Sequence, residues 1–244
     1  MKKIELPYPS YTGLLKYTGE SIAPAWVDYD ENTILIGGTR NATSSGTYTT
    51  TFTPKEGFCW VDNTVTPYSV TWTIYKDILT VPSQSGSLTY NDTIQKPTWK
   101  NYDSSKMTMG GTQSAKYAGT YEASFTPKSG YIWSDGTTET KKASWSIKKA
   151  TAVVTVEPTS LTLSLSTDAA GKKITVTSTG SRPQLIGYGQ ITVLTCTSSY
   201  ITDNTTEVLV KPVGIGTGFV RVGYNHLNSD YNQVQVDVEV TVTA

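Results

Sequence analysis

The chain offers few side chains that could catalyse a reaction or bind a metal. Its 244 residues include one histidine, His226, and two cysteines, Cys59 and Cys196. Acid–base or nucleophilic catalysis needs a base beside a nucleophile, paired carboxylates or a metal cluster. His226 lies in the polar segment YNHLNSDYN, with no second histidine, cysteine or spaced acidic pattern beside it. We therefore expect no catalytic residue, no metal site and no cofactor.

Short acidic groups are the remaining candidates for binding a cation. They occur as DYDEN at Asp28–Asn32 and as the pairs Asp62–Asn63 and Asp203–Asn204. A calcium loop of the common kind supplies carboxylates at regular spacing and closes with a glutamate, and that pattern is missing here. These acidic residues are therefore expected to be solvated turn residues.

Aromatic residues are the other candidates, because exposed tryptophan and tyrosine rings can stack against sugars. The chain has six tryptophans and sixteen tyrosines. Every tryptophan has a counterpart 73 residues away, as Trp60 has Trp133, so a shared packing role is expected for them. Tyrosines without a counterpart are better binding candidates. In the C-terminal part they are Tyr188, Tyr200, Tyr224 and Tyr231, which we predict to bind ligand, and earlier ones are Tyr8, Tyr11, Tyr68, Tyr75 and Tyr117.

The same offset runs through the first part of the chain as a sequence repeat. FTPKEGFCW at Phe52–Trp60 returns as FTPKSGYIW at Phe125–Trp133, and GGT and GTY recur in the same register. Two copies of one domain are therefore predicted, at 1–76 and 77–149. The remainder, 150–244, has no tryptophan and is predicted to be a third domain of a different kind.

All three segments have the pattern of strands and turns. GTYTTTFTP and GTYEASFTP alternate with period two, as half-buried antiparallel strands do. The PKEG and PKSG segments that follow predict turns, so each nonapeptide is interpreted as a hairpin. In the third segment, alternating runs separated by turn residues predict a small sandwich whose long last strand spans 234–242. No window has helical periodicity, and the predicted fold class is all-β.

Charge and cysteine usage limit the partners and the setting. The formal net charge is zero and no stretch approaches the roughly 18 apolar residues of a membrane span, so neither nucleic acid binding nor membrane insertion is expected. Pro7 and Pro9 interrupt the place where a secretory signal would be apolar.

Cys59 aligns with Ile132 and Cys196 lies in a different domain, so both are predicted to be buried free thiols, compatible with folding in a reducing cytosol.

The repeated pattern LTYNDTIQKPTWKNYDSSKMTMGGT…AGTYEASFTPKSGYIWSDGTT…ASWSI resembles tandem glycine-rich Ig-like repeats of bacterial surface proteins and of tail or virion proteins of Firmicutes phages. The third segment, with VEPTSLTLSLS and VGIGTGFVRVGY, resembles a bacterial Ig-like domain of the second group, although SRPQLIGYGQ departs from its usual short turn. The resemblance implies three Ig-like β-sandwich domains in tandem. It also implies a non-catalytic role as spacer, decoration or adhesive.

Two hypotheses of function follow from these observations. In the first, the chain is a structural display protein of a phage virion, on tail or capsid. It would fold in the host cytoplasm, contact other virion proteins and aid weak attachment to the bacterial surface or its glycans. The alternative is an adhesive or spacer segment of a bacterial cell-surface protein, located at the cell surface among other surface proteins. The ligand and the oligomeric state stay open.

Overall fold

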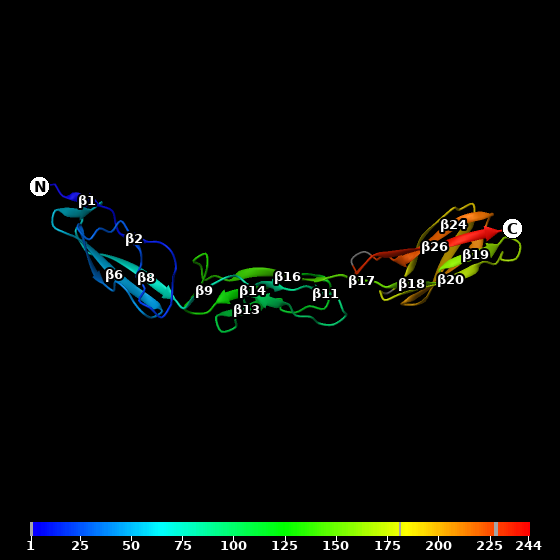
Figure 1. Cartoon of the computed structure of the whole chain (residues 1–244), viewed down its shortest axis with the longest axis horizontal. Helices are drawn as coiled ribbons and strands as arrows, with labels where there is room; N and C mark the ends of the chain where they lie inside the picture. The colour runs from blue at the N-terminus through cyan, green and yellow to red at the C-terminus, as the bar shows by residue number, and fades with distance from the viewer. Residues whose placement is uncertain (1, 181, 227–228) are drawn as a thin grey trace. The chain divides into compact units, whose positions relative to one another are not determined.

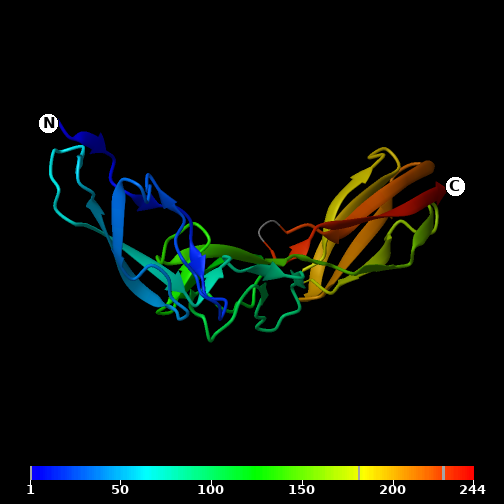
Figure 2. The ribbon, with the colours of Figure 1, turned by 60° about the vertical axis from the view of Figure 1, so that its left-hand side comes forward.

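The computed structural model describes residues 2–180, 182–226 and 229–244, and every regular element among them is a β-strand (Figures 1 and 2). Contacts between residues group the chain into two compact units. The first comprises Met1–Ser85, Thr98–Gln113 and Glu122–Trp145, and the second comprises Gly86–Pro97, Ser114–Tyr121 and Ser146–Ala244. The predicted all-β class is confirmed.

The first copy of the repeat contains eight strands. Four of them form a sheet in the order β3–β8–β6–β5, in which β3 runs parallel to β8. Two short pairs complete the copy, antiparallel β2–β4 and parallel β1–β7. The strands are β1 (Ile4–Leu6), β2 (Ser10–Tyr11), β3 (Leu15–Lys16), β4 (Trp26–Val27), β5 (Ile34–Gly38), β6 (Gly46–Pro54), β7 (Phe58–Trp60) and β8 (Tyr68–Tyr75).

The second copy repeats these strands 73 residues later, with no boundary displaced by more than one residue. They are β9 (Asp77–Leu79), β10 (Ser83–Ser85), β11 (Leu88–Thr89), β12 (Thr98–Lys100), β13 (Met107–Gly111), β14 (Gly119–Pro127), β15 (Tyr131–Trp133) and β16 (Lys141–Lys148). Pairing also repeats: β15 is parallel to β9, β13 is antiparallel to β14, and β11 is parallel to the end of β16. Strands β14 and β16 have residues in both contact units. The prediction of two copies of one repeat is confirmed.

A tyrosine near the start of one long strand in each copy marks the fold as Ig-like. The Tyr48 hydroxyl donates to the Ser44 carbonyl at 2.7 Å, and the Tyr121 hydroxyl donates to the Tyr117 carbonyl at 2.7 Å. A hydroxyl that bonds back to the backbone a few residues upstream is the tyrosine corner of immunoglobulin sandwiches. The sequence motif GTY therefore has a structural role in both copies.

The third sandwich has two four-stranded sheets, in the orders β18–β20–β23–β22 and β19–β26–β24–β21. This is the immunoglobulin arrangement, with a split first strand that pairs with both sheets. Its strands are β17 (Ala150–Thr151), β18 (Val154–Glu157), β19 (Ser160–Ser164), β20 (Lys172–Ser178), β21 (Gln184–Gly189), β22 (Leu194–Thr202), β23 (Thr205–Pro212), β24 (Gly216–Tyr224), β25 (Tyr231–Asn232) and β26 (Val234–Thr243). The predicted long last strand is confirmed as β26.

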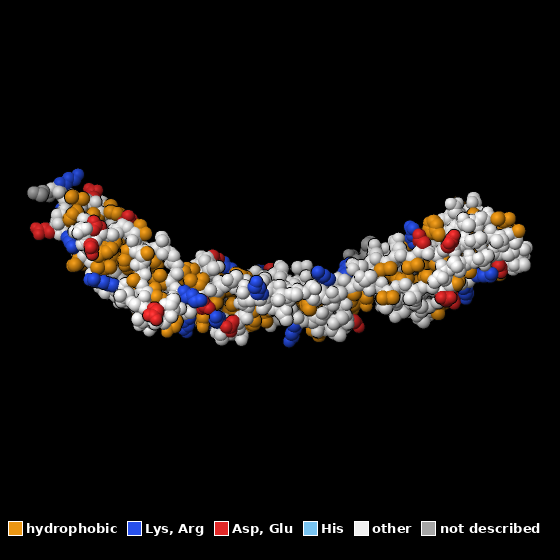
Figure 3. Space-filling model, viewed as in Figure 1, with side chains coloured by type: hydrophobic (Ala, Val, Ile, Leu, Met, Phe, Trp, Pro, Cys, Tyr) orange, Lys and Arg blue, Asp and Glu red, His pale blue; other side chains and the backbone are white. Residues whose placement is uncertain are grey.

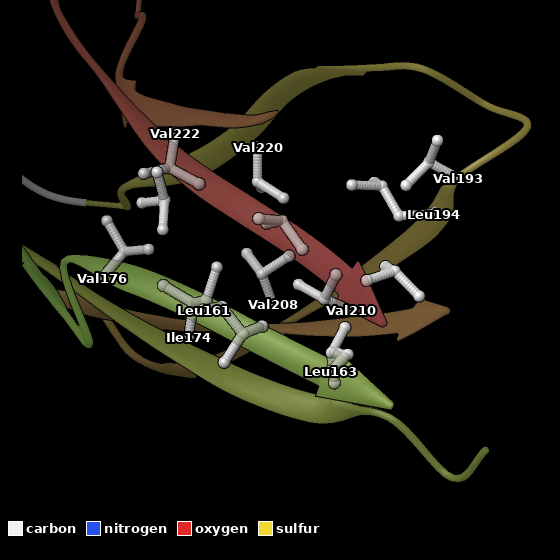
Figure 4. Close-up of a cluster of buried hydrophobic side chains, with 13 residues drawn as sticks. Leu161, Leu163, Ile174, Val176, Val193, Leu194, Val208, Val210, Val220 and Val222 are labelled. Atoms are coloured by element: carbon white, nitrogen blue, oxygen red, sulfur yellow. The ribbon is translucent and has the colours of Figure 1, made fainter. Parts of the chain in front are cut away.

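Branched aliphatic side chains fill the space between these two sheets. Figure 4 shows Ile174 and Val176 of β20, Val208 of β23 and Leu161 of β19 among the valines of β24, Val220 and Val222. All of these except Leu161 are fully buried, and Leu161 is 7% exposed. Side chains that alternate between core and solvent along each strand account for the period-two pattern seen in the sequence.

One sequence interpretation is wrong, because the repeated nonapeptide is not a hairpin. The turn after β6 forms, and the Phe58 N–H donates to the Lys55 carbonyl at 3.1 Å. However, β6 pairs with β5 and β8, whereas β7 pairs with β1 in the parallel sense. The turn therefore moves the chain from one sheet to another. Residue alternation reveals a strand but not its partner, and this explains the error.

Four tryptophans fill the cores of the two copies. Trp60, Trp72, Trp133 and Trp145 are at most 1% exposed, and each indole N–H donates a hydrogen bond within its own copy. Trp26 and Trp99 are half-buried and pack edge-on against Phe52 and Phe125, with ring centroids 4.8 and 4.9 Å apart. The predicted packing role is therefore confirmed for all six tryptophans.

The first copy passes into the second through one residue, since β8 ends at Tyr75 and β9 begins at Asp77. The Asp77 carboxylate forms two ion pairs, with the Lys106 ammonium group at 2.7 Å and with the Lys16 ammonium group, from the first copy, at 2.6 Å. Hydrogen bonds from Lys106 and then from Lys16 lower the pKa of Asp77 to about 2. The Lys76 N–H also donates to the Gly130 carbonyl at 2.8 Å. This passage is therefore cross-linked rather than loose, while the predicted boundaries after residues 76 and 149 remain predictions.

Replacing Trp133 tests the packing role. Trp133→Ala should lower the free energy of unfolding of the second copy by about 3–5 kcal/mol, because it leaves a cavity and removes a satisfied indole. Denaturant titration followed by tryptophan fluorescence measures the change. Val153→Ala, at a site 60% exposed, is the control and should melt like the parent. A Trp133→Ala chain with parental stability would contradict the core assignment.

Asp77 should make the first unit sensitive to acid. Its pKa is lowered in the folded state, so its stabilising effect is present above pH 4 and is lost as the pH falls toward 2. We expect Asp77→Asn to destabilise the chain by about 1 kcal/mol at pH 7. Thermal melts of parent and variant between pH 2 and 7 should converge at the acid end. A constant difference would contradict this prediction. The pKa of Asp135 is likewise lowered to about 2. Because Asp135 is present in both parent and variant, its effect cancels in the difference between their melting temperatures.

Candidate functional site

Three loops of the third sandwich meet at one end of its sheets. They connect β20 to β21, β22 to β23, and β24 to β25. The Arg182 N–H donates to the Asp203 carbonyl, and His226 Nε2 lies 2.7 Å from the Arg182 carbonyl oxygen. A carbonyl only accepts, so Nε2 carries the proton. The Ser178 N–H donates to the Asn204 carbonyl at 3.0 Å, which ties the first loop to the second. Backbone bonds therefore join the first loop to the second, and the His226 side chain joins the third loop to the first.

Two adjoining hollows open between these loops. One of about 390 Å³ is lined by Arg182, Tyr200, Ile201, Thr202 and Asp203. The other, of about 410 Å³, is lined by Arg182, Asp203, Tyr224, His226 and Ser229. Arg182 and Asp203 line both hollows, so they stand at the centre of this surface. We call the surface lined by these residues the loop site.

The four tyrosines predicted to bind ligand have different environments. Tyr200 is 60% exposed at the rim of the loop site, whereas Tyr224 lies under it and is 3% exposed. The Tyr231 ring packs against Tyr224, with centroids 5.8 Å apart, and is half-buried. Tyr188 lies on β21 and packs against the hydrophobic core, away from the loops. The structure thus brings Tyr200, Tyr224 and Tyr231 to one end of the sandwich and separates Tyr188 from them.

Sequence reasoning missed the two charged residues of the loop site. Arg182 and Asp203 are exposed, and in the described part of the chain neither side chain forms an ion pair. Arg182 has φ 56°, a left-handed conformation that turns the loop sharply. It lies in SRPQLIGYGQ, the segment that departs from the family pattern, and this departure is the sequence signal that could have found it. Asp203 was treated as an ordinary turn residue.

This arrangement suits recognition rather than covalent chemistry. An exposed tyrosine ring offers an apolar face, while a guanidinium and a carboxylate offer hydrogen-bond donors and acceptors on the same surface. Among the described residues, no group of three or more His, Cys, Asp and Glu side chains is placed to hold a metal ion. The described part of the chain also contains no helix long and apolar enough to cross a membrane.

The surface charges of the molecule are of mixed sign. Figure 3 shows lysine and arginine side chains interspersed with aspartate and glutamate over the visible face. Several of them form exposed pairs, such as Arg221 with Asp237 at 2.7 Å and Lys142 with Glu122 at 2.7 Å. The charged pair of the loop site differs from these because its two members are not joined to each other.

Neither cysteine forms a disulfide. Cys59 is buried on β7, and Cys196 is half-buried on β22. Burial raises the pKa of Cys196 to about 12. Both thiols are free, as predicted, but the prediction that both are buried is wrong for Cys196, because it lies half-buried on an edge strand. Its low thiolate fraction argues against Cys196 as a nucleophile at neutral pH.

The solved structures that resemble this chain have low sequence identity and low structural similarity to it. No protein-family model matches the chain, and no curated protein matches it in sequence. Among solved structures, the Escherichia coli adhesin FdeC is 11% identical, with 97% of this chain and 96% of that chain covered and a TM-score of 0.32. Domains 4 and 5 of the S-layer protein SbsC are 14% identical, with 99% and 100% covered and a TM-score of 0.31.

A third neighbour was solved with a sugar. It is SGBP-B of the Bacteroides ovatus mixed-linkage glucan utilization locus in complex with a mixed-linkage heptasaccharide. It is 12% identical, with 96% of this chain and 66% of that chain covered and a TM-score of 0.18. At these scores the assignment to the Ig-like class rests on strand order and on the tyrosine corners.

The environment of the thiols gives a direct test by labelling. At pH 8 and under native conditions, neither cysteine should react with Ellman's reagent over several minutes. Cys59 is buried, and the raised pKa of the half-buried Cys196 keeps its thiolate fraction low. In guanidinium chloride two thiols should react. Cys196→Ala should leave the native trace unchanged and remove one of the two thiols after unfolding. Rapid native labelling would show that edge strand β22 opens.

Proposed function

We propose that the chain is a non-catalytic spacer and attachment segment of a bacterial surface structure. The observation that carries this proposal is the direct junction between the two copies. A single residue separates β8 from β9, and Asp77 forms ion pairs with a lysine from each copy. Repeated sandwiches that are joined without a flexible linker suit a spacer.

Attachment is assigned to the loop site of the third sandwich. Tyr200 supplies the exposed ring, and the exposed side chains of Arg182 and Asp203 supply hydrogen bonds that can orient polar groups. Surface glycans present apolar faces of sugar rings together with hydroxyl groups, and this combination fits the ring and the charged pair. Tyr224 and Tyr231 support the site from beneath, while Tyr188 takes no part in it.

Two settings suit such a segment, and we place a cell-surface protein first. Display on a phage virion is the second setting, and the free thiols favour it because a chain that folds in a reducing cytoplasm needs no disulfide. Mass spectrometry of density-purified particles and of the cell-wall fraction from the source strain would separate them. Intact chain in particles would assign it to the virion, and peptides only in the wall fraction would assign it to the cell surface.

Binding to cells tests the attachment role. We expect Arg182→Ala/Tyr200→Ala to reduce binding of the fluorescently labelled chain to cells of the source strain about tenfold, a loss of about 1.4 kcal/mol. Both side chains are exposed, so the thermal melt should stay within a degree or two of the parent. Tyr17→Ala, at a site 45% exposed in the first copy, is the matched control and should bind normally. Unchanged binding by the double variant would remove the loop site from the proposal.

A further inference from the structure

The two copies of the repeat share one scaffold at the turn that follows β7 and β15. Asp62 accepts from the Thr64 N–H and hydroxyl at 3.0 and 2.7 Å. In the second copy Asp135 accepts from Thr137 at the same two distances. The next residue has positive φ in both copies, 64° at Asn63 and 80° at Gly136. The backbone of this turn is therefore the same in both copies.

The buried tryptophan below the turn is also held in the same way. The Trp60 indole N–H donates to the Thr66 carbonyl at 2.9 Å, and the Trp133 indole N–H donates to the Glu139 carbonyl at 2.7 Å. Both indoles are at most 1% exposed. Differences on the surface of the turn are therefore not required by the fold beneath it.

The surface of the first copy is aromatic and apolar at this turn. Tyr8 stacks on Trp60 with centroids 4.9 Å apart, and Tyr68 packs on Tyr8 at 4.5 Å. Tyr68 is 36% exposed, and Val61 and Val65, which flank the turn, are 54% and 44% exposed. The Tyr8 hydroxyl donates to Asp62 at 2.9 Å. We call this surface, made by Tyr8, Val61, Asp62, Val65 and Tyr68, the aromatic face.

The second copy carries different side chains at the equivalent positions. Tyr8 and Tyr68 are replaced by Val81 and Lys141, and Val61 and Val65 are replaced by Ser134 and Thr138. Lys141 pairs with Asp135 at 2.5 Å, where the first copy has the bond from Tyr8 to Asp62. The second copy shows that the scaffold is complete without any aromatic residue on this surface.

The aromatic face has the chemistry of a sugar platform. The ring of Tyr68 offers an apolar face to the C–H groups of a pyranose, as tyrosine does at surfaces where one side is wet. Asp62 stands beside it as an acceptor, and hydrogen bonds from Thr64 and then from Tyr8 lower the pKa of its carboxyl group. Oδ1 accepts both bonds from Thr64, whereas Oδ2 accepts only the bond from Tyr8. Oδ2 therefore keeps a second lone pair, which can accept from a sugar hydroxyl while Asp62 keeps these bonds.

Docking of another sandwich is a poorer fit for this face. In the second copy the equivalent turn already meets the first copy, because a Cβ at Gly136 would lie 3.8 Å from the Leu14 side chain. That contact lies at a glycine, in a turn flanked by the small polar residues Ser134 and Thr138. The first copy has a larger residue, Asn63, and exposed rings instead, so its surface does not reproduce the contact that joins sandwiches in this chain.

We propose that the aromatic face of the first copy binds sugar rings of a polysaccharide, with Tyr68 as the stacking platform and Asp62 as the hydroxyl acceptor. This second site lies in the first unit and does not depend on the loop site of the third sandwich. The second copy carries the same scaffold without the site. The chain therefore contains its own negative control.

Trp60 and Trp133 report on the two surfaces in one experiment. Their indole N–H signals in a nitrogen-15 correlation spectrum would be followed while cellohexaose, chitohexaose or maltoheptaose is added to the full chain. We expect at least one of these sugars to shift the Trp60 signal saturably, with a dissociation constant of about 1 mM, because Tyr8 stacks on that indole. The Trp133 signal should not move.

Exchanging residues between the copies sharpens the test. Tyr8→Val/Tyr68→Lys places second-copy residues on the first copy, so it should fold and lose binding at least tenfold. Val81→Tyr/Lys141→Tyr should make the Trp133 signal respond to the same sugar. Arg182→Ala/Tyr200→Ala should leave the Trp60 response intact, which separates this proposal from the loop site.

Three outcomes would overturn the proposal. One is equal shifts of both indoles, which would mean nonspecific contact. Another is no shift with any of the three sugars. The last is a Trp60 shift that depends on protein concentration without sugar, which would assign the face to a second copy of this chain.

Discussion

Each repeat depends on a buried indole whose N–H must be satisfied. A polar group without a partner in the core costs free energy, so the chain after Trp60 has to return a carbonyl to it. The Thr66 carbonyl does so, and Glu139 does so for Trp133. This requirement fixes the path of the turn that follows and explains why the turn is the same in both copies although its surface residues differ.

The second constraint is the lack of a flexible linker between the two copies. Asp77 is the first residue of the first strand of the second copy, and its carboxylate forms ion pairs with a lysine from each copy. An exposed ion pair contributes little by itself, but one carboxylate that holds two ammonium groups and a backbone N–H orders three segments together. These polar contacts therefore order the connection between the copies.

Much of the fold could be predicted from the sequence because duplication doubles the signal. The offset between Trp60 and Trp133 identifies the repeat, and alternation identifies β6, β14 and β26. Strand partners could not be predicted, since the same alternation fits a hairpin and a crossing between sheets, and the parallel pairing of β7 with β1 gives no local pattern. The site was harder to predict. Tyr200 was predicted because it is aromatic, but Arg182 and Asp203 come together only through backbone bonds between loops distant in sequence.

Comparison of the two copies separates what folding requires from what it does not. Positions that both copies keep, such as Tyr48 and Tyr121, complete hydrogen bonds that the sandwich needs. Positions that differ on an unchanged scaffold are free of that requirement, and Tyr68 opposite Lys141 is such a position. Weak sites of this kind are sufficient on a surface that displays many chains, because the effective concentration of the second binding event replaces affinity at each site. A chain that displays weak sites in this way can bind a surface firmly and still release any single contact quickly.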